Sequence, residues 1–150
     1  MLLLWQTGRL LEPAFGRLRF GLLYVVALLG GSFGALVAAP HTVTVGASGA
    51  VFGLMGALFI AERQGLFGRQ RSSIGFLIVI NLVLTVAIPG ISLGGHVGGL
   101  AAGAATGWLF QEFERRKLAS TVPVVMAVAL SITLFIGSLW AATLWTHPIF

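Results

Sequence analysis

Ser48 and His96 are the two residues of this chain whose types could together perform chemistry. Ser48 stands in the stretch GASG and His96 in the stretch GGHVGG. A serine hydroxyl becomes a nucleophile when a neighbouring base accepts its proton, and histidine is the usual base near neutral pH. The same small residues would equally let two helices touch without any chemistry. The choice between these interpretations depends on where the surrounding elements place the two side chains.

The composition is that of a membrane protein. Hydrophobic residues make up 57% of the 150 residues and charged residues only 9%, which is too little charge for a water-exposed surface. The clustered charges leave apolar runs that can span hydrocarbon. We expect an all-α, polytopic membrane helix bundle forming one domain over residues 1–150, with five full transmembrane helices and a short N-terminal helix remnant, MLLLWQ. The five apolar runs cover residues 20–39, 46–61, 74–88, 95–110 and 122–145.

The basic residues occupy alternate loops. The two intervening connections, PHTVTV and PGISLG, carry no Lys or Arg. The positive-inside rule therefore places the basic loops in the cytoplasm and the other connections outside. This topology accounts for the net charge of +5, so we expect the lipid bilayer and no nucleic acid as a partner. The nine basic residues are Arg9, Arg17, Arg19, Arg63, Arg69, Arg71, Arg115, Arg116 and Lys117.

The predicted topology places Ser48 and His96 at similar depth. Both begin apolar segments that run from outside to inside. At 1.5 Å per residue, the helix from Ser48 to Ala61 spans roughly 21 Å of a hydrocarbon core about 30 Å thick. Ser48 would then lie on the order of 9 Å below the outer surface, and the same estimate for His96 gives roughly 8 Å. These matching depths favour a paired site.

Such a pair would work as a dyad. All acidic residues belong to the cytoplasmic side, so none can orient the imidazole as an aspartate does in a soluble triad. Unpaired N–H groups at the start of the Ser48 helix could instead stabilise a developing oxyanion. The chain has no cysteine and no cluster of metal ligands, and we expect neither a metal nor a cofactor. The acidic residues are Glu12, Glu62, Glu112 and Glu114.

Glycines could bring the two helices together. They recur every four residues from Gly95 to Gly107, and the same spacing occurs at Gly49 and Gly53 and at Gly30 and Gly34. Such spacing forms smooth faces for close helix approach. Taken alone, such repeats are common packing motifs and favour no chemistry. Phe52 lies one turn after Ser48 on the same helix face, where its ring could pack on the imidazole or simply face the core or lipid.

The stretches GASGAVFGLMGA and GHVGGLAAGAATG, on alternate segments at outer depth, resemble the rhomboid intramembrane serine proteases. LLEPAFGRLRFGLLYVV and NLVLTVAIPGISLGGHVGG are also similar to that family, so the likeness covers about residues 3 to 111. The resemblance implies a nucleophilic Ser48, a general base in His96, a supporting Gly46 and a Phe52 that packs on the histidine. It also implies cleavage of transmembrane or juxtamembrane segments of membrane proteins, and residues 122–145 are similar to an extra seventh helix of some members.

The family pattern also predicts a departure. Aligning MLLLWQTGRLLE with it places Met1 just after an H-x-x-x-N pair that helps to bind the oxyanion, which predicts an N-terminally truncated copy without the first helix and most of the second. The expected protein is a multi-pass cell-membrane endopeptidase whose site opens to the outer side. The alternative is a catalytically inactive relative that binds transmembrane helices. A small transporter is disfavoured because no clear internal repeat is present.

Overall fold

Every regular element of the described chain is a helix. The computed structural model describes residues 2–39, 47–67 and 73–144, and the predicted all-α class is confirmed for these ranges. Two of the helices, α2 and α6, are long and apolar enough to cross a membrane, and α4 is a shorter apolar helix. The elements are α1 (Leu2–Phe15), α2 (Arg17–Ala38), α3 (Ser48–Arg63), α4 (Ile74–Ala87), α5 (Leu93–Arg115) and α6 (Thr121–Thr143).

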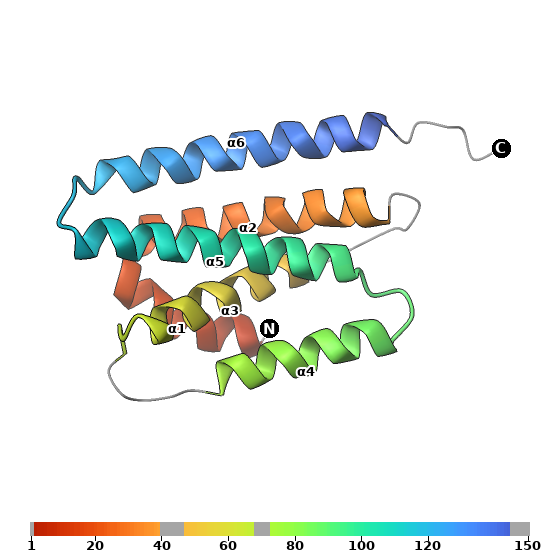
Figure 1. Ribbon diagram of the computed structural model, residues 1–150, viewed down its shortest axis with the longest axis horizontal. Coiled ribbons are helices and arrows are strands. Elements are labelled where there is room, and N and C mark those ends of the chain that lie inside the picture. Colours follow the sequence, from red (N-terminus) through yellow and green to blue (C-terminus); the bar gives the residue numbers. More distant parts are fainter. Residues whose placement is uncertain (1, 40–46, 68–72, 145–150) are drawn as a thin grey trace.

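The helices lie roughly side by side along one axis, with α6 along one edge of the bundle and α4 along the opposite edge (Figure 1). Helix α3 packs against α1, α2, α4 and α5, and the buried share of its residues is the largest of the six described helices. Ten of its 16 residues are buried, whereas three of the 14 residues of α4 are. Glycine and alanine make up much of the buried surface of α3, which lets its neighbours approach closely.

The predicted glycine contact between α3 and α5 is confirmed. A Cβ atom added at Gly99 would lie 2.0 Å from the carbonyl oxygen of Gly49, and one at Gly103 would lie 2.2 Å from that of Gly53. Real Cβ atoms do not come this close to backbone oxygens, so only glycine permits this packing.

Helix α5 also has a second close-packed face, which meets the glycine face predicted at Gly30 and Gly34 of α2. A Cβ added at Gly98 would lie 2.4 Å from the carbonyl oxygen of Gly30, and one at Gly34 would lie 2.3 Å from that of Gly94. The three helices α2, α3 and α5 therefore form the rigid centre of the bundle, since each backbone limits the position of the next.

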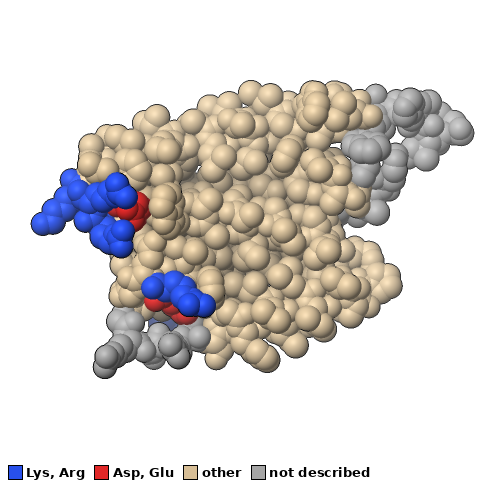
Figure 2. All heavy atoms as spheres, in the orientation of Figure 1, with Lys and Arg blue, Asp and Glu red and all other residues tan. Residues whose placement is uncertain are grey.

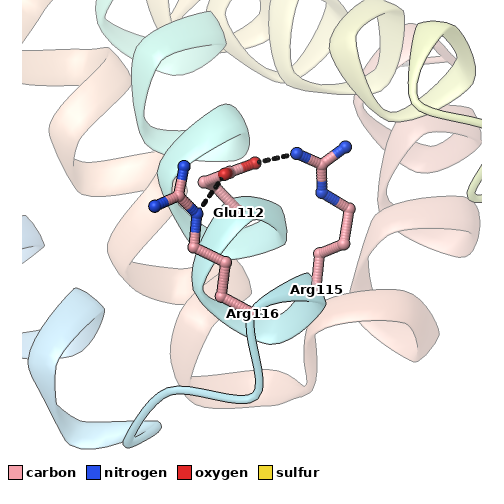
Figure 3. Close-up of polar contacts among 3 residues, drawn as sticks. All are labelled: Glu112, Arg115 and Arg116. Carbon is pink, nitrogen blue, oxygen red and sulfur yellow. Dashed lines mark hydrogen bonds and ion pairs between the residues drawn. The ribbon is translucent and has the colours of Figure 1, made fainter.

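Charged residues gather at one end of the bundle, where α5 ends and α6 begins (Figure 2). There Arg19 of α2 pairs with Glu114 of α5, with the side-chain nitrogen and oxygen 2.8 Å apart. Glu112 is buried and accepts hydrogen bonds from both Arg115 and Arg116 (Figure 3). The loop before α5, residues 88–92, contains no charged residue.

The N-terminal helix is longer than predicted. The sequence interpretation limited it to MLLLWQ, but α1 continues to Phe15. Arg9 and Glu12 lie on its exposed side, while Thr7, Leu11 and Phe15 are buried. Gly16 then adopts a φ of +81°, a left-handed conformation that separates α1 from α2. The first turn of α1 lies about halfway along the bundle (Figure 1).

Candidate active site

Ser48 and His96 both lie in the first turns of their helices. Ser48 is the first residue of α3, and His96 follows three residues after α5 begins. The hydroxyl of Ser92 caps α5 by accepting a hydrogen bond from the N–H of Gly95 at 3.0 Å. Serine is a favoured N-cap because its oxygen pairs with an N–H that has no partner inside the helix. This cap fixes the helix start that carries His96.

The backbones of α3 and α5 nearly touch beside these two residues. A Cβ added at Gly49 would lie 3.0 Å from the carbonyl oxygen of Gly95, and these two glycines directly adjoin Ser48 and His96 in the sequence. Ser48 is exposed, whereas His96 is buried with 7% of its surface accessible. The arrangement therefore presents a reachable hydroxyl next to an imidazole that is largely shielded from solvent.

Two cavities are shared by Ser48 and His96. One, of about 450 Å³, lies between α2, the start of α3 and the loop that leads into α5. The other, of about 560 Å³, lies between α1, α3 and α4, and Asn81 also lines it. Both residues line both cavities, so a substrate chain or water in either one would meet both side chains.

The Phe52 ring stacks on the His96 ring. The ring centroids are 4.1 Å apart and the ring planes are inclined by 19°. Phe52 is itself buried, with 5% of its surface accessible, so the stack limits rotation of the imidazole. The predicted supporting residue Gly46 lies outside the described residues, as do the two other histidines, His41 and His147.

Thr85 of α4 is a contact of the imidazole that sequence reasoning missed. Its Oγ1 lies 2.7 Å from Nδ1 of His96, and the same hydroxyl donates a hydrogen bond to the Asn81 carbonyl oxygen at 2.7 Å. Thr85 is buried, with 4% of its surface accessible. No sequence signal marks this pairing, because a threonine in an apolar helix ordinarily bonds to its own helix and needs no other partner.

The described acidic side chains lie at the end of the bundle where α5 ends, whereas His96 lies near the start of α5, at the opposite end (Figures 1 and 2). No group of three His, Asp or Glu side chains in residues 2–39, 47–67 and 73–144 gathers as a metal site would require. What the arrangement offers is a hydroxyl, an imidazole and a helix N-terminus, and these are the groups used in acyl transfer by a serine nucleophile.

The fold and the site together describe a helical membrane protein with a serine and a histidine at one end of its central helices. Comparison with known proteins defines the family. A family model described as "Rhomboid domain" matches residues 1–113. The chain therefore belongs to the rhomboid family, as the motifs around Ser48 and His96 indicate.

Similar proteins occur in bacteria and plants. The chain is 35% identical to "Rhomboid protease GluP" of Bacillus subtilis over 85% of its own length and 26% of that protein. It is 37% identical to "RHOMBOID-like protein 4" of Arabidopsis thaliana over 73% of its length and 29% of that protein. It is 34% identical to "Putative rhomboid protease YdcA" of B. subtilis over 71% and 56% of the two chains. The chain thus spans about a quarter to a half of these relatives. No solved structure matches the chain.

Proposed function

We propose that the protein is an intramembrane serine endopeptidase that cleaves transmembrane or juxtamembrane segments of membrane proteins. The observation that carries the proposal is that Ser48 and His96 line the same two cavities while Phe52 stacks on the imidazole. Membership of the rhomboid family supports the reaction class, and relatives named as rhomboid proteases point the same way.

The proposed reaction uses a dyad. Nε2 of His96 accepts the Ser48 hydroxyl proton as Oγ attacks the carbonyl carbon of the scissile peptide bond. The resulting imidazolium gives that proton to the leaving amine as the carbon–nitrogen bond breaks. Water then attacks the acyl–Ser48 ester, again losing a proton to His96, and the carboxylate product leaves as Ser48 Oγ recovers a proton. The stack with Phe52 keeps the imidazole plane in place through these transfers.

The start of α3 can bind the oxyanion. The first N–H groups of a helix have no hydrogen-bond partner in a preceding turn. Within the described residues, the first backbone hydrogen bond of α3 runs from the N–H of Val51 to the carbonyl oxygen of Ala47. The positive end of the helix dipole lies at the same point. A tetrahedral intermediate on Ser48 Oγ would place its negative oxygen near these N–H donors. The loss of one such donor typically lowers the rate by about 10²–10³.

We further propose that five helices, α2 to α6, span the membrane as a single rhomboid-like domain with α6 as an additional helix. Helix α3 has 16 residues, about 24 Å at 1.5 Å per residue, against a core about 30 Å thick. Its first residue, Ser48, therefore lies below the outer surface when its charged end reaches the cytoplasmic boundary. Glycine and alanine account for ten of the 23 residues of α5, which lowers the hydropathy of that helix.

The topology is open to a direct test because the chain contains no cysteine. Single variants Ile91→Cys and Ala119→Cys place a thiol at exposed positions on the two opposite ends of the bundle. We expect a membrane-impermeant maleimide to label Ile91→Cys in intact bacterial cells, and Ala119→Cys only after the membrane is opened. Labelling of Ala119→Cys alone in intact cells would reverse the proposed orientation.

The activity is tested with a fluorophosphonate probe, which forms a stable adduct with an activated serine. We expect the purified protein in detergent to be labelled, and the labelling to be lost in both Ser48→Ala and His96→Ala. Ser131→Ala is the matched control, because the Ser131 hydroxyl bonds only to the Ala127 carbonyl oxygen of its own helix among the described contacts. Labelling that persists in Ser48→Ala would exclude Ser48 as the nucleophile, and a folded protein that is never labelled would favour the inactive, helix-binding alternative.

A further inference from the structure

We propose that Thr85 is a positioning residue that holds the proton of neutral His96 on Nδ1 and so leaves Nε2 free to act as the base. This inference rests on the proposed function for its catalytic consequence, but its structural content stands without it. It assigns to a hydroxyl of α4 the place that a carboxylate takes in a soluble triad. The four acidic residues of the chain lie toward the other end of the bundle.

The two hydrogen bonds of the Thr85 hydroxyl determine where the imidazole proton lies. A threonine hydroxyl has one hydrogen to donate and oxygen lone pairs that accept. The carbonyl oxygen of Asn81, 2.7 Å away, can only accept. The hydroxyl hydrogen therefore points to Asn81, and the contact with Nδ1 of His96 at 2.7 Å requires Nδ1–H to donate to Oγ1. If the hydroxyl hydrogen pointed to Nδ1 instead, Oγ1 of Thr85 and the carbonyl oxygen of Asn81 would lie 2.7 Å apart with no hydrogen between them.

Burial makes this assignment consequential. Thr85 and His96 have only 4% and 7% of their surface accessible, so solvent cannot replace the contact cheaply. The neighbours of Thr85 in the sequence are exposed, Leu84 by 46% and Val86 by 72%. Thr85 is the one buried residue in the second half of α4, which distinguishes a specific contact from general packing.

The same contact serves the charged form of the histidine. When Nε2 accepts the Ser48 proton, Nδ1–H remains a donor and Oγ1 remains its acceptor, so no reorientation is needed during the transfer. A tautomer with the proton on Nε2 would present Ser48 with a donor instead of a base. In serine proteases the wrong tautomer is costly, up to about 10⁴ in rate when the orienting aspartate is altered. For a neutral hydroxyl worth a single ordinary hydrogen bond, we expect about a 2- to 10-fold loss.

The variants follow from the geometry. Thr85→Val keeps the shape of the side chain but removes its hydroxyl. Thr85→Ser keeps the hydroxyl. Thr106→Val is the matched control, because Thr106 is buried in α5 and its hydroxyl bonds the Ala102 carbonyl oxygen at 2.8 Å, as that of Thr85 bonds Asn81. Both valine variants lose the bond to the preceding turn, but only Thr85→Val loses the imidazole contact.

The decisive measurement is the ¹⁵N spectrum of the His96 ring. The chain has three histidines, so the background His41→Asn with His147→Asn leaves one imidazole in protein labelled with [¹⁵N]histidine. At a pH where His96 is neutral, we expect Nδ1 to carry the ring proton in this background. We expect the same result when Thr85→Ser or Thr106→Val is added to it. We expect Thr85→Val to move protonation toward Nε2. Protonation of Nε2 in the parent protein, or an unchanged spectrum in Thr85→Val, would overturn the proposal.

Fluorophosphonate labelling supplies the second readout. We expect the second-order labelling rate to fall about 2- to 10-fold in Thr85→Val, and to remain near the parent rate in Thr85→Ser and Thr106→Val. A parent protein that is never labelled would remove the proposed endopeptidase function, while the ¹⁵N spectrum would still decide the assignment of the proton. If Thr85→Val fails to fold, the spectra of the parent and of Thr85→Ser carry the test.

Discussion

Replacing Gly99 with alanine should move Ser48 away from His96. Gly99 lies three residues after His96 on α5 and faces the backbone of Gly49, the residue that follows Ser48. The new methyl carbon would lie 2.0 Å from the Gly49 carbonyl oxygen, whereas real Cβ atoms stay at least 3.0 Å from such atoms. The obstacle is backbone rather than a flexible side chain, so the two helices must move apart by about 1 Å merely to reach the shortest contact that real Cβ atoms make.

The displacement predicts two magnitudes. Overpacking of a well-packed interior costs about 1–3 kcal/mol, and we expect the free energy of unfolding to fall by that amount. A misplacement of about 1 Å between reacting groups can cost about 10²-fold in rate, and we expect the fluorophosphonate labelling rate to fall on that scale. The loss of labelling should exceed what a slightly increased unfolded fraction explains.

Two alanine variants separate these effects. Gly107→Ala adds a Cβ that would lie 2.7 Å from Cβ of Ala57 on the same helix interface, about 12 Å further along α5 at 1.5 Å per residue. It should destabilise the protein while largely preserving labelling. Gly21→Ala adds a methyl with nothing within 4 Å, and its helix is expected to gain stability, about 0.5–1 kcal/mol. Thermal unfolding in detergent and labelling rates measure both quantities. A Gly99→Ala variant that matches Gly21→Ala in both would refute the close α3–α5 contact.

Two further perturbations test the packing on His96 and the charged end of the bundle. Phe52→Leu removes a ring stacked at 4.1 Å on the imidazole. Because such aromatic pairs contribute about 0.5–1.5 kcal/mol, the fluorophosphonate labelling rate should fall about 2- to 10-fold. An unchanged rate would show that the stack does not orient the histidine. Arg19→Gln removes the ion pair with Glu114, and because the carboxylate is 64% exposed, unfolding free energy should fall by only about 0.5–1 kcal/mol. That loss of unfolding free energy should shrink at high salt. The Arg17 side chain is 95% exposed, so Arg17→Gln should leave the stability unchanged. Equal losses in the two variants would contradict this account.

The charge pattern predicted most helix limits to within a few residues, because charged residues and turns are excluded from the middle of apolar helices. The segment 122–145 corresponds to α6 (Thr121–Thr143), and 46–61 to α3 (Ser48–Arg63). Helix α5 begins two residues earlier than expected and continues to Arg115, since its last turn carries Glu112 paired with two arginines. A hydropathy pattern cannot predict such a charged turn, because ion pairing rather than burial of apolar surface stabilises it.

The site was predictable where sequence spacing alone determines geometry. Ser48 and Phe52 share one face of one helix, and glycines beside both Ser48 and His96 predict that the two helices approach each other. The contact of Thr85 with His96 could not be derived in this way. Thr85 and Thr106 make the same bond to their own helices, and only the way α4 returns against α5 through residues 88–92 distinguishes them.

The site divides its two geometric requirements between helices of different rigidity. The distance between Ser48 and His96 is determined by α3 and α5, whose backbones are in glycine contact at Gly49 and Gly99. The imidazole tautomer is determined by α4, which buries only three of its residues and whose Thr85 makes the contact with His96. A displacement of α4 would therefore release Nδ1 without separating Ser48 from His96, because no residue of α4 lies between α3 and α5 at their glycine contacts. The same displacement would open the cavity between α1, α3 and α4 that both residues line, so the space for a substrate and the orientation of the base depend on one loosely packed helix.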